Sequence, residues 1–217
     1  MITVFGGIKG GSGKTTLSTN ICILQALSGK KVLLVDSDEQ RSASDWSEHR
    51  ENLEIDTAWT TITLSGAAVR SQVLKMKDNY DEIIIDVGGR DTTSQRAALT
   101  IADTLVAPFQ PRSFDVWTLG KLSELLDEVY IINPNLTAYA VINRADSQGK
   151  DNNEALSIIN ETGSIICLDK MVCQRKAFAN ASAEGKGVIE MHPQDQKAIE
   201  EIQAVNEAIF SNMATPN

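Results

Sequence analysis

Short apolar runs recur along this chain and alternate with segments whose apolar residues repeat at helical spacing. Short runs without regular polar positions are typical of strands buried on both faces of a sheet. Alternating strands and helices imply right-handed crossovers and a parallel sheet. We therefore predict an α/β fold, in which a mostly parallel, twisted sheet carries helices on both faces. The expected strands are Ile2–Phe5, Lys31–Asp36, Ala58–Leu64, Glu82–Asp86, Thr104–Phe109, Ala138–Asn143 and Ser164–Leu168, and the expected helices include Leu17–Leu27, Leu119–Val129 and Ile199–Ile209.

The segment between the first expected strand and the first expected helix is rich in glycine. Residues 8–16 read Ile-Lys-Gly-Gly-Ser-Gly-Lys-Thr-Thr. Such a turn exposes backbone N–H groups that can cradle a polyphosphate at the positive end of the helix. Lys14 would reach the β- and γ-phosphates, and the Thr15 hydroxyl would bind Mg²⁺. The usual P-loop spacing places glycine where this chain has Ile8, and a second lysine, Lys9, precedes the glycine pair.

Two of the expected strands end in carboxylates. Asp36 closes one strand and is followed by Asp38, and Asp86 closes another. The carboxyl ends of parallel strands lie at one edge of the sheet, where ligands bind. A carboxylate there can hold the water shell of Mg²⁺, and a second one can orient or deprotonate an attacking water. An aspartate that ends a strand more often starts a turn, but Lys14 and Thr15 upstream favour the functional interpretation of Asp86.

Length and composition fit one globular domain. The chain has 217 residues, 42% of them hydrophobic, which suits one large α/β domain better than two small ones. We assign residues 1–210 to this domain and 211–217 to a loose tail.

No apolar run approaches the roughly 18–20 residues of a membrane span. The three cysteines form no C-x-x-C spacing, so we expect no disulfide framework and no zinc site. We therefore expect a cytoplasmic location, where thiols are kept reduced.

Several motifs resemble those of one known family, in the family's order. Lys9–Thr16 resembles the deviant Walker A motif of the ParA/MinD superfamily. Val35–Gln40 resembles its V-D-x-D-P-Q motif, and Ile84–Asp86 resembles Walker B. Pro108–Asp115 is similar to the P-x-x-P-S-x-x-D segment near the nucleotide base, and Val141–Arg144 to the later base-binding strand end. The short start is similar to that of small, ParF-like plasmid-partition proteins of the ParA type.

This resemblance implies a site for ATP and Mg²⁺ shared between two subunits. Lys9 would cross the dimer interface to the phosphates of the partner's ATP, where a cation stabilises charge that develops during phosphoryl transfer. Asp38 would activate the hydrolytic water, and Asp36 would support the metal region. Thr15 would bind Mg²⁺ directly and Asp86 would hold it through water. The implied catalytic residues are Lys9, Lys14 and Asp38.

The resemblance also implies which residues contact the nucleotide. Pro111 and Asn143 would line the adenine, with Arg144 beside them. The sequence departs from the family pattern at three places: Glu39 stands where proline is usual, Arg112 stands where serine or proline is common, and the turn Val87–Arg90 replaces the frequent C-P-P or G-A-G turn. The phosphates would lie against Gly10, Gly11, Ser12, Gly13, Lys14, Thr15 and Thr16.

A basic segment near residue 180 resembles one that contributes to non-specific DNA binding in small ParA-type proteins. It combines Gln174–Phe178 with Glu184–Glu190, and Arg175, Lys176 and Lys186 are its candidate phosphate contacts. The alternative is a solvated helix end with scattered lysines. The net charge of −9 and a pI near 4.8 argue against a protein coated in positive charge, although they leave room for a small basic patch.

The resemblance implies a partition or positioning ATPase. ATP would drive formation of a homodimer, the dimer would bind DNA non-specifically, and a ParB-like adaptor would stimulate slow hydrolysis. DNA binding would bring the protein to the nucleoid. The alternative is a metabolic or other cargo-positioning member of the superfamily that does not bind DNA. The segment after Gln196 is acidic and lacks a basic face, so we do not expect membrane targeting through it.

Overall fold

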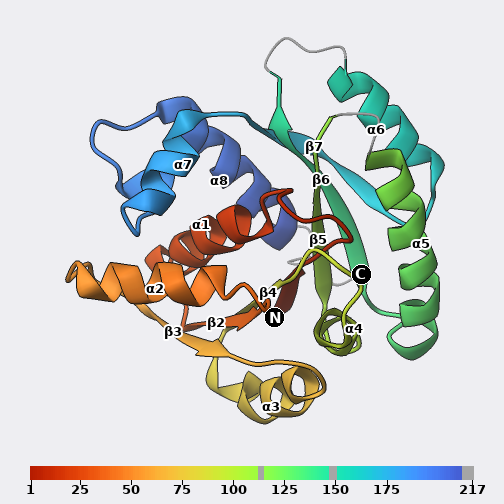
Figure 1. Ribbon diagram of the computed structural model, residues 1–217, viewed down its shortest axis with the longest axis horizontal. Coiled ribbons are helices and arrows are strands. Elements are labelled where there is room, and N and C mark those ends of the chain that lie inside the picture. Colours follow the sequence, from red (N-terminus) through yellow and green to blue (C-terminus); the bar gives the residue numbers. More distant parts are fainter. Residues whose placement is uncertain (112–114, 147–150, 212–217) are drawn as a thin grey trace.

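The computed structural model describes residues 1–111, 115–146 and 151–211. Within these ranges the strands form one seven-stranded sheet in the order β3-β2-β4-β1-β5-β6-β7, and every neighbouring pair is parallel (Figure 1). The predicted α/β fold is therefore confirmed. The strands are β1 (Ile2–Phe5), β2 (Val32–Ser37), β3 (Trp59–Thr63), β4 (Glu82–Val87), β5 (Thr104–Phe109), β6 (Thr137–Ala145) and β7 (Ile166–Cys173).

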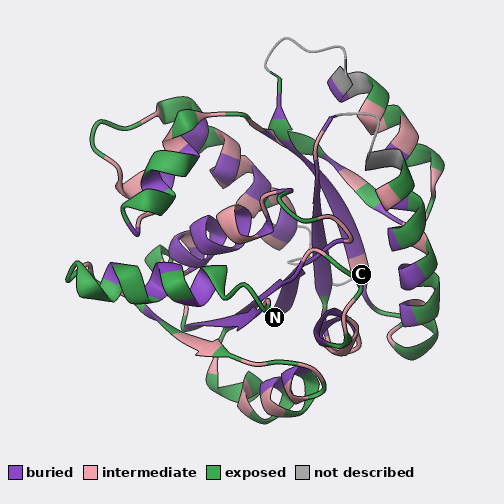
Figure 2. Ribbon diagram, viewed as in Figure 1, coloured by how far each residue is buried: buried purple, intermediate pink, exposed green. Residues whose placement is uncertain are grey.

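Helices cover both faces of the sheet, and a hydrophobic core lies on each side (Figure 2). One core packs the sheet against α3 (Ala68–Met76), α4 (Thr93–Leu99), α5 (Asp115–Ile132) and α6 (Asp151–Glu161). The other packs it against α1 (Lys14–Leu27), α2 (Ser42–Asn52), α7 (Lys176–Ala183) and α8 (Gln196–Ser211). Two short 3-10 turns complete the described elements, η1 (Lys77–Asn79) and η2 (Val188–Glu190).

The expected strands agree with the structure except at the last one. The apolar run ends at Leu168, but β7 begins at Ile166 and continues to Cys173. It passes through Asp169 and Lys170, which are exposed. Because β7 is an edge strand, polar side chains can face solvent there without ending the ladder.

The three expected helical periods lie inside α1, α5 and α8, which are longer than the periods themselves. α1 begins at Lys14, so Lys14, Thr15 and Thr16 of the predicted phosphate loop lie in its first turn. It ends at Leu27, and Gly29 follows in the left-handed conformation with φ +86°, as expected of a helix C-terminus. α8 extends to Ser211, the first residue assigned to the tail; residues 212–217 lie outside the described residues. Among the described helices, none has the length and apolar character needed to cross a membrane.

Candidate functional site

The predicted phosphate loop and the predicted carboxylates meet at the carboxyl edge of the sheet. β4 lies between β1 and β2, and the register pairs Asp86 with Phe5 on one side and with Asp36 on the other. The loop that leaves β1 therefore runs beside both aspartates. This confirms the expectation, drawn from a parallel sheet, that the three motifs share one edge.

Hydrogen bonds from distant strands hold the phosphate loop. The Asn143 Nδ2 atom donates to the Ser12 carbonyl at 2.6 Å, and the Gln110 Nε2 atom donates to the Gly11 carbonyl at 3.0 Å. Gly13 has φ +97°, and a Cβ atom there would lie 2.1 Å from Asn143 Nδ2. Glycine at this position therefore allows both the left-handed backbone and the close approach of the amide.

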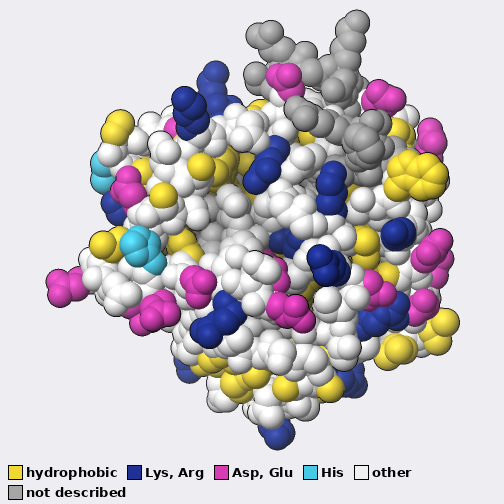
Figure 3. Space-filling view, viewed as in Figure 1, with side chains coloured by type: hydrophobic (Ala, Val, Ile, Leu, Met, Phe, Trp, Pro, Cys, Tyr) yellow, Lys and Arg dark blue, Asp and Glu magenta, His cyan; other side chains and the backbone are white. Residues whose placement is uncertain are grey.

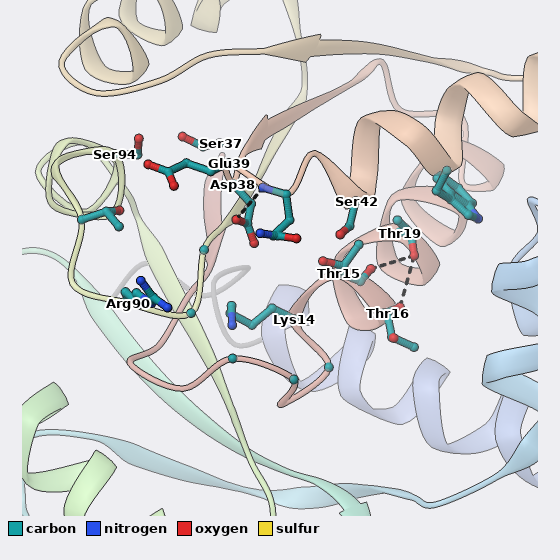
Figure 4. Close-up of a pocket in the computed structure, with 18 of the residues that line it drawn as sticks. Lys14, Thr15, Thr16, Thr19, Ser37, Asp38, Glu39, Ser42, Arg90 and Ser94 are labelled. Carbon is teal, nitrogen blue, oxygen red and sulfur yellow. Dashed lines mark hydrogen bonds between the residues drawn. The ribbon is translucent and has the colours of Figure 1, made fainter.

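A cavity of about 650 Å³ opens above the loop and extends to α2 and to the turn after β4. Figure 3 shows this face of the molecule hollowed near its middle, with basic and acidic side chains at the rim. In Figure 4, polar side chains from the loop, from the β2–α2 connection and from the turn after β4 surround the space. Its lining includes Gly10, Gly11, Gly13, Lys14, Thr15, Thr16, Asp38, Glu39, Trp46, Gly88, Gly89, Arg90 and Arg144.

Lys14 is buried at the base of this cavity. Its Nζ atom donates to the Lys9 carbonyl at 3.0 Å, so its amine lies across the loop. Burial lowers the pKa of Lys14, while the charges of Asp86 and Asp38 act in the opposite direction. The amine is thus a partly desolvated cation close to two carboxylates, an environment in which a phosphate gains a strong electrostatic contact.

Asp86 is fully buried at the end of β4. The Thr15 hydroxyl donates to Asp86 Oδ2 at 2.6 Å, whereas Asp86 Oδ1 has no hydrogen-bond partner among the described residues. Burial raises the pKa of Asp86 to about 7; Asp36 adds to this rise, and the Thr15 bond opposes it.

The Thr15–Asp86 pair fits the Mg²⁺ site that the resemblance implies. A hydroxyl and a carboxylate with a free oxygen are suitable oxygen donors for this ion, which keeps several waters. Within the described ranges no three His, Cys, Asp or Glu side chains converge on a common metal position. Mg²⁺ here would therefore take its remaining ligands from water and phosphate.

Asp36 holds the start of α2 and the loop that carries Asp38. Its Oδ2 atom accepts from the Ser44 backbone N–H at 2.7 Å, and its Oδ1 atom accepts from the Asp38 N–H at 3.1 Å. A carboxylate at the first turn of a helix satisfies an otherwise unpaired N–H. Asp38 is half-buried and lines the cavity. The geometry thus makes Asp36 a support for the loop that places Asp38.

The turn after β4 lies directly against the phosphate loop. A Cβ atom on Gly89 would be 2.5 Å from the Cα and N atoms of Gly10 and 2.7 Å from the Lys9 carbonyl carbon. A Cβ atom on Gly88 would lie 3.2 Å from Asp38 Oδ1. The glycine pair therefore brings this turn close to both sides of the cavity.

The residues predicted near the base line two smaller cavities beside the main one. Asn143 lines a space of about 400 Å³, Pro111 lines one of about 490 Å³, and Arg144 borders both. Asn143 also supports the Ser12 carbonyl, a contact that the sequence did not indicate. The base-binding assignments of Pro111, Asn143 and Arg144 stay predictions.

The three candidate DNA contacts differ in what they already bind. The Arg175 guanidinium forms two hydrogen bonds to the Glu201 carboxylate, at 3.0 and 2.6 Å. Lys186 Nζ lies 2.9 Å from Glu184 Oε2. Lys176 is exposed at the start of α7. Two of the three cations are thus paired with acids, which lowers the positive charge that this segment presents.

A cluster around Arg50 joins α2 to η2 and was not predicted from the sequence. Arg50 is buried, and its guanidinium donates to both carboxylate oxygens of Glu190, at 2.8 and 2.6 Å. It also lies 5.0 Å from the ring of Trp59, which stacks on Trp46 with ring centroids 5.7 Å apart. Trp46 lines the main cavity. No local pattern could have shown an ion pair whose members stand 140 residues apart in the chain.

The fold and this site define a P-loop nucleotide-binding protein: a glycine-rich loop between β1 and α1, a buried lysine in the loop, and aspartates on β2 and β4. The chain matches the CobQ/CobB/MinD/ParA nucleotide binding domain family over residues 3–188. It belongs to this family, which confirms the resemblance to the ParA/MinD superfamily.

Individual relatives extend the match over most of the chain. It is 30% identical over 207 residues to maintenance of carboxysome distribution protein A of Halothiobacillus neapolitanus, covering 94% of each chain. It is 32% identical over 173 residues to sporulation initiation inhibitor protein Soj of Bacillus subtilis, covering 62% of this chain and 66% of Soj. A Cyanothece McdA variant in complex with ATP has the same fold, with a TM-score of 0.78 at 18% identity over 96% of this chain and 95% of that one.

Proposed function

We propose that the chain is a Mg²⁺-dependent positioning ATPase that acts as a nucleotide-controlled switch. The observation that carries this proposal is the cavity in which the phosphate loop faces Asp38 on one side and the Thr15–Asp86 pair on the other. Lys14 would bind the phosphates, and bound Mg²⁺ would neutralise charge on them. Asp38 would orient and deprotonate the attacking water. Hydrolysis by the chain alone would be slow.

The switch would work through a homodimer formed when ATP binds. Lys9 directly precedes Gly10, which lines the cavity, and it would reach the phosphates of the partner subunit's ATP. Lys9→Ala should still bind ATP but lose ATP-dependent dimerisation in sedimentation experiments. Asp38→Ala should bind ATP and remain dimeric, because hydrolysis is blocked. An unchanged dimer in the first variant, or normal turnover in the second, would remove that residue from its role.

The names of the relatives and of similar solved structures describe more than one cellular role. One is described as distributing carboxysomes and another as a sporulation inhibitor, and solved structures with this fold include plasmid partition proteins. For this chain we propose the segregation of a plasmid or chromosome in the cytoplasm. A ParB-like adaptor would stimulate hydrolysis, and the ATP-bound dimer would bind DNA non-specifically through Arg175, Lys176 and Lys186.

The pairing of Arg175 with Glu201 and of Lys186 with Glu184 favours a second candidate. In it, the ATP-bound dimer positions another cargo, or serves metabolism, without binding DNA. The two candidates differ in one measurable property, because phosphate contacts give DNA binding that is independent of sequence and sensitive to salt.

Plasmid-DNA binding with ATP, ADP or no nucleotide, with the molecular mass followed in parallel, separates these candidates. ATP-dependent dimerisation together with DNA binding supports partition, whereas dimerisation without DNA binding supports the second candidate. Arg175→Glu should reduce DNA retention and leave ATP binding unchanged. Lys75→Glu, on the exposed face of α3, changes the net charge equally and should retain DNA as the wild type does. Equal DNA binding by both variants would exclude Arg175 as a contact.

A further inference from the structure

Arg90 ends the turn after β4 and lines the same cavity as Lys14. Its side chain is exposed. Figure 4 shows Arg90 and Lys14 among the residues that surround this cavity. Asp38 and Glu39 also line this space, yet no carboxylate among the described residues forms an ion pair with Arg90. The cavity therefore presents a second cation that is open to an anionic ligand.

The acid next to Arg90 in the chain is already neutralised. Arg96 donates to both carboxylate oxygens of Asp91, each at 2.7 Å, and its Nη1 atom donates to Glu128 of α5 at 2.5 Å. These exposed pairs contribute little to overall stability, but they hold Asp91 against Arg96 of α4. The positive charge of Arg90 is thus not cancelled by its nearest acidic neighbour.

The position of Arg90 relative to the phosphate loop is set by Gly89. The backbone of Gly89 packs against Lys9 and Gly10. Arg90 is the next residue in the chain, so it lies one residue away from this contact with the loop. Gly88, on the other side of Gly89, lies against Asp38. A ligand that binds Arg90 would therefore act on a turn that touches both the phosphate loop and Asp38.

We propose that Arg90 binds the terminal phosphate of ATP and thereby distinguishes ATP from ADP; this inference rests on the proposed function. A planar guanidinium donates two parallel hydrogen bonds to phosphate oxygens, which suits it to this ligand. The phosphate loop surrounds the inner phosphates, whereas Arg90 approaches from the turn on the other side. Contact between Arg90 and the third phosphate makes the position of the turn depend on which nucleotide is bound. Through Gly88, the same contact acts on the loop that carries Asp38.

This role is tested by measuring the affinity of the protein for ADP and for a non-hydrolysable ATP analogue, each in the presence of Mg²⁺. The measurements use protein concentrations at which sedimentation shows a monomer. Arg90→Ala should weaken binding of the ATP analogue by about 10- to 100-fold, the loss expected for a charge-assisted contact, and should change ADP binding by less than about 3-fold. Arg90→Lys keeps the charge but not the paired donors, so it should recover only part of the preference for the ATP analogue.

Arg144→Ala is the matched control, because Arg144 lines the same cavity from β6. It should change binding of the two nucleotides by the same factor. An Arg90→Ala variant that binds both nucleotides as the wild type does, or weakens both equally, would overturn the inference and leave the proposed function standing. A wild-type protein that binds neither nucleotide would overturn both.

Discussion

The two sides of the nucleotide cavity are organised in different ways. On the loop side, carbonyl groups accept hydrogen bonds from Asn143 and Gln110, and Lys14 lies across the loop. On the carboxylate side, Asp86 is buried with one oxygen unpartnered among the described residues, and its pKa is raised to about 7. One side is supported by neighbouring strands, while the other holds negative charge with too little compensation.

The loop side is preorganised to bind phosphate, whereas the carboxylate side depends on a ligand to balance its charge. The loop does not need a ligand to hold its backbone amides in place, so less conformational entropy is lost when phosphate binds. The Asp86 side gains most from a cation, since a metal would satisfy the free oxygen and favour the charged carboxylate. Three kinds of substitution test this difference between the two sides: changes of Asp86, of the turn that contacts both sides, and of the residues that support the loop.

The largest expected effect is a pH dependence of stability without Mg²⁺. Because the folded-state pKa of Asp86 lies above its ordinary value of 3.8, the folded protein holds this proton more tightly than the unfolded chain. The free energy of unfolding should therefore fall as the pH rises from about 4 to about 7. Relative to the wild type, Asp86→Asn should gain stability over this range, by an amount of the order of 4 kcal/mol. Urea unfolding across pH measures the difference.

Two comparisons test the assignment of this slope to Asp86. Asp78→Asn, on the exposed turn η1, should keep the wild-type slope. Saturating Mg²⁺ and nucleotide should reduce it in the wild type. A slope that is the same in Asp86→Asn as in the wild type would assign the pH dependence to other groups.

The next effect concerns the turn that links the two sides. In Gly89→Ala, the new methyl group would lie 2.5 Å from backbone atoms of Gly10, which cannot move without displacing the loop. We expect a loss of about 1–3 kcal/mol in the free energy of unfolding, together with weaker nucleotide binding. Gly120→Ala is the matched control, because a Cβ atom there meets no atom within 4 Å. In the middle of α5 it should stabilise the protein by about 0.5–1 kcal/mol. Similar unfolding curves for the two variants would mean that the turn does not pack on the loop.

The smallest effect separates the two supports of the loop. Asn143→Ala removes a buried donor and leaves the Ser12 carbonyl without it, so we expect a loss of about 1–2 kcal/mol. The bond from Gln110 to the Gly11 carbonyl is exposed, and water can replace the donor in Gln110→Ala, which should cost about 0.5 kcal/mol or less. Chemical unfolding and ADP titration of both variants check this order. A larger loss for Gln110→Ala would show that the exposed contact is the main support.

Most of the sheet was predictable from the sequence, and several helices were not. Strands such as Glu82–Val87 are buried on both faces, so their composition alone distinguishes them. α2 has the opposite character: its buried positions include Ser44, Ser47 and Arg50, and no apolar period marks it. Its buried polar groups are satisfied by partners distant in the chain, as in the contact between Ser47 and Thr61, and sequence spacing carries no record of such partners.

In the site, too, some contacts were predictable from the sequence and others were not. Lys14, Thr15, Asp36 and Asp86 were predicted to converge because a parallel sheet brings strand ends together, and their contacts confirm this. The support of Ser12 by Asn143 was not predicted, because it depends on how β6 sits beside the loop.

The stacked tryptophans offer a consequence for measurement. Trp46 borders the cavity, its ring is stacked on Trp59, and the Arg50 guanidinium lies over both. The third indole, Trp117 on α5, is 81% exposed. The buried pair and the exposed ring emit at different wavelengths, so the unlabelled protein carries an optical reporter beside its cavity and an internal reference away from it. Nucleotide occupancy can then be followed by intrinsic fluorescence in real time.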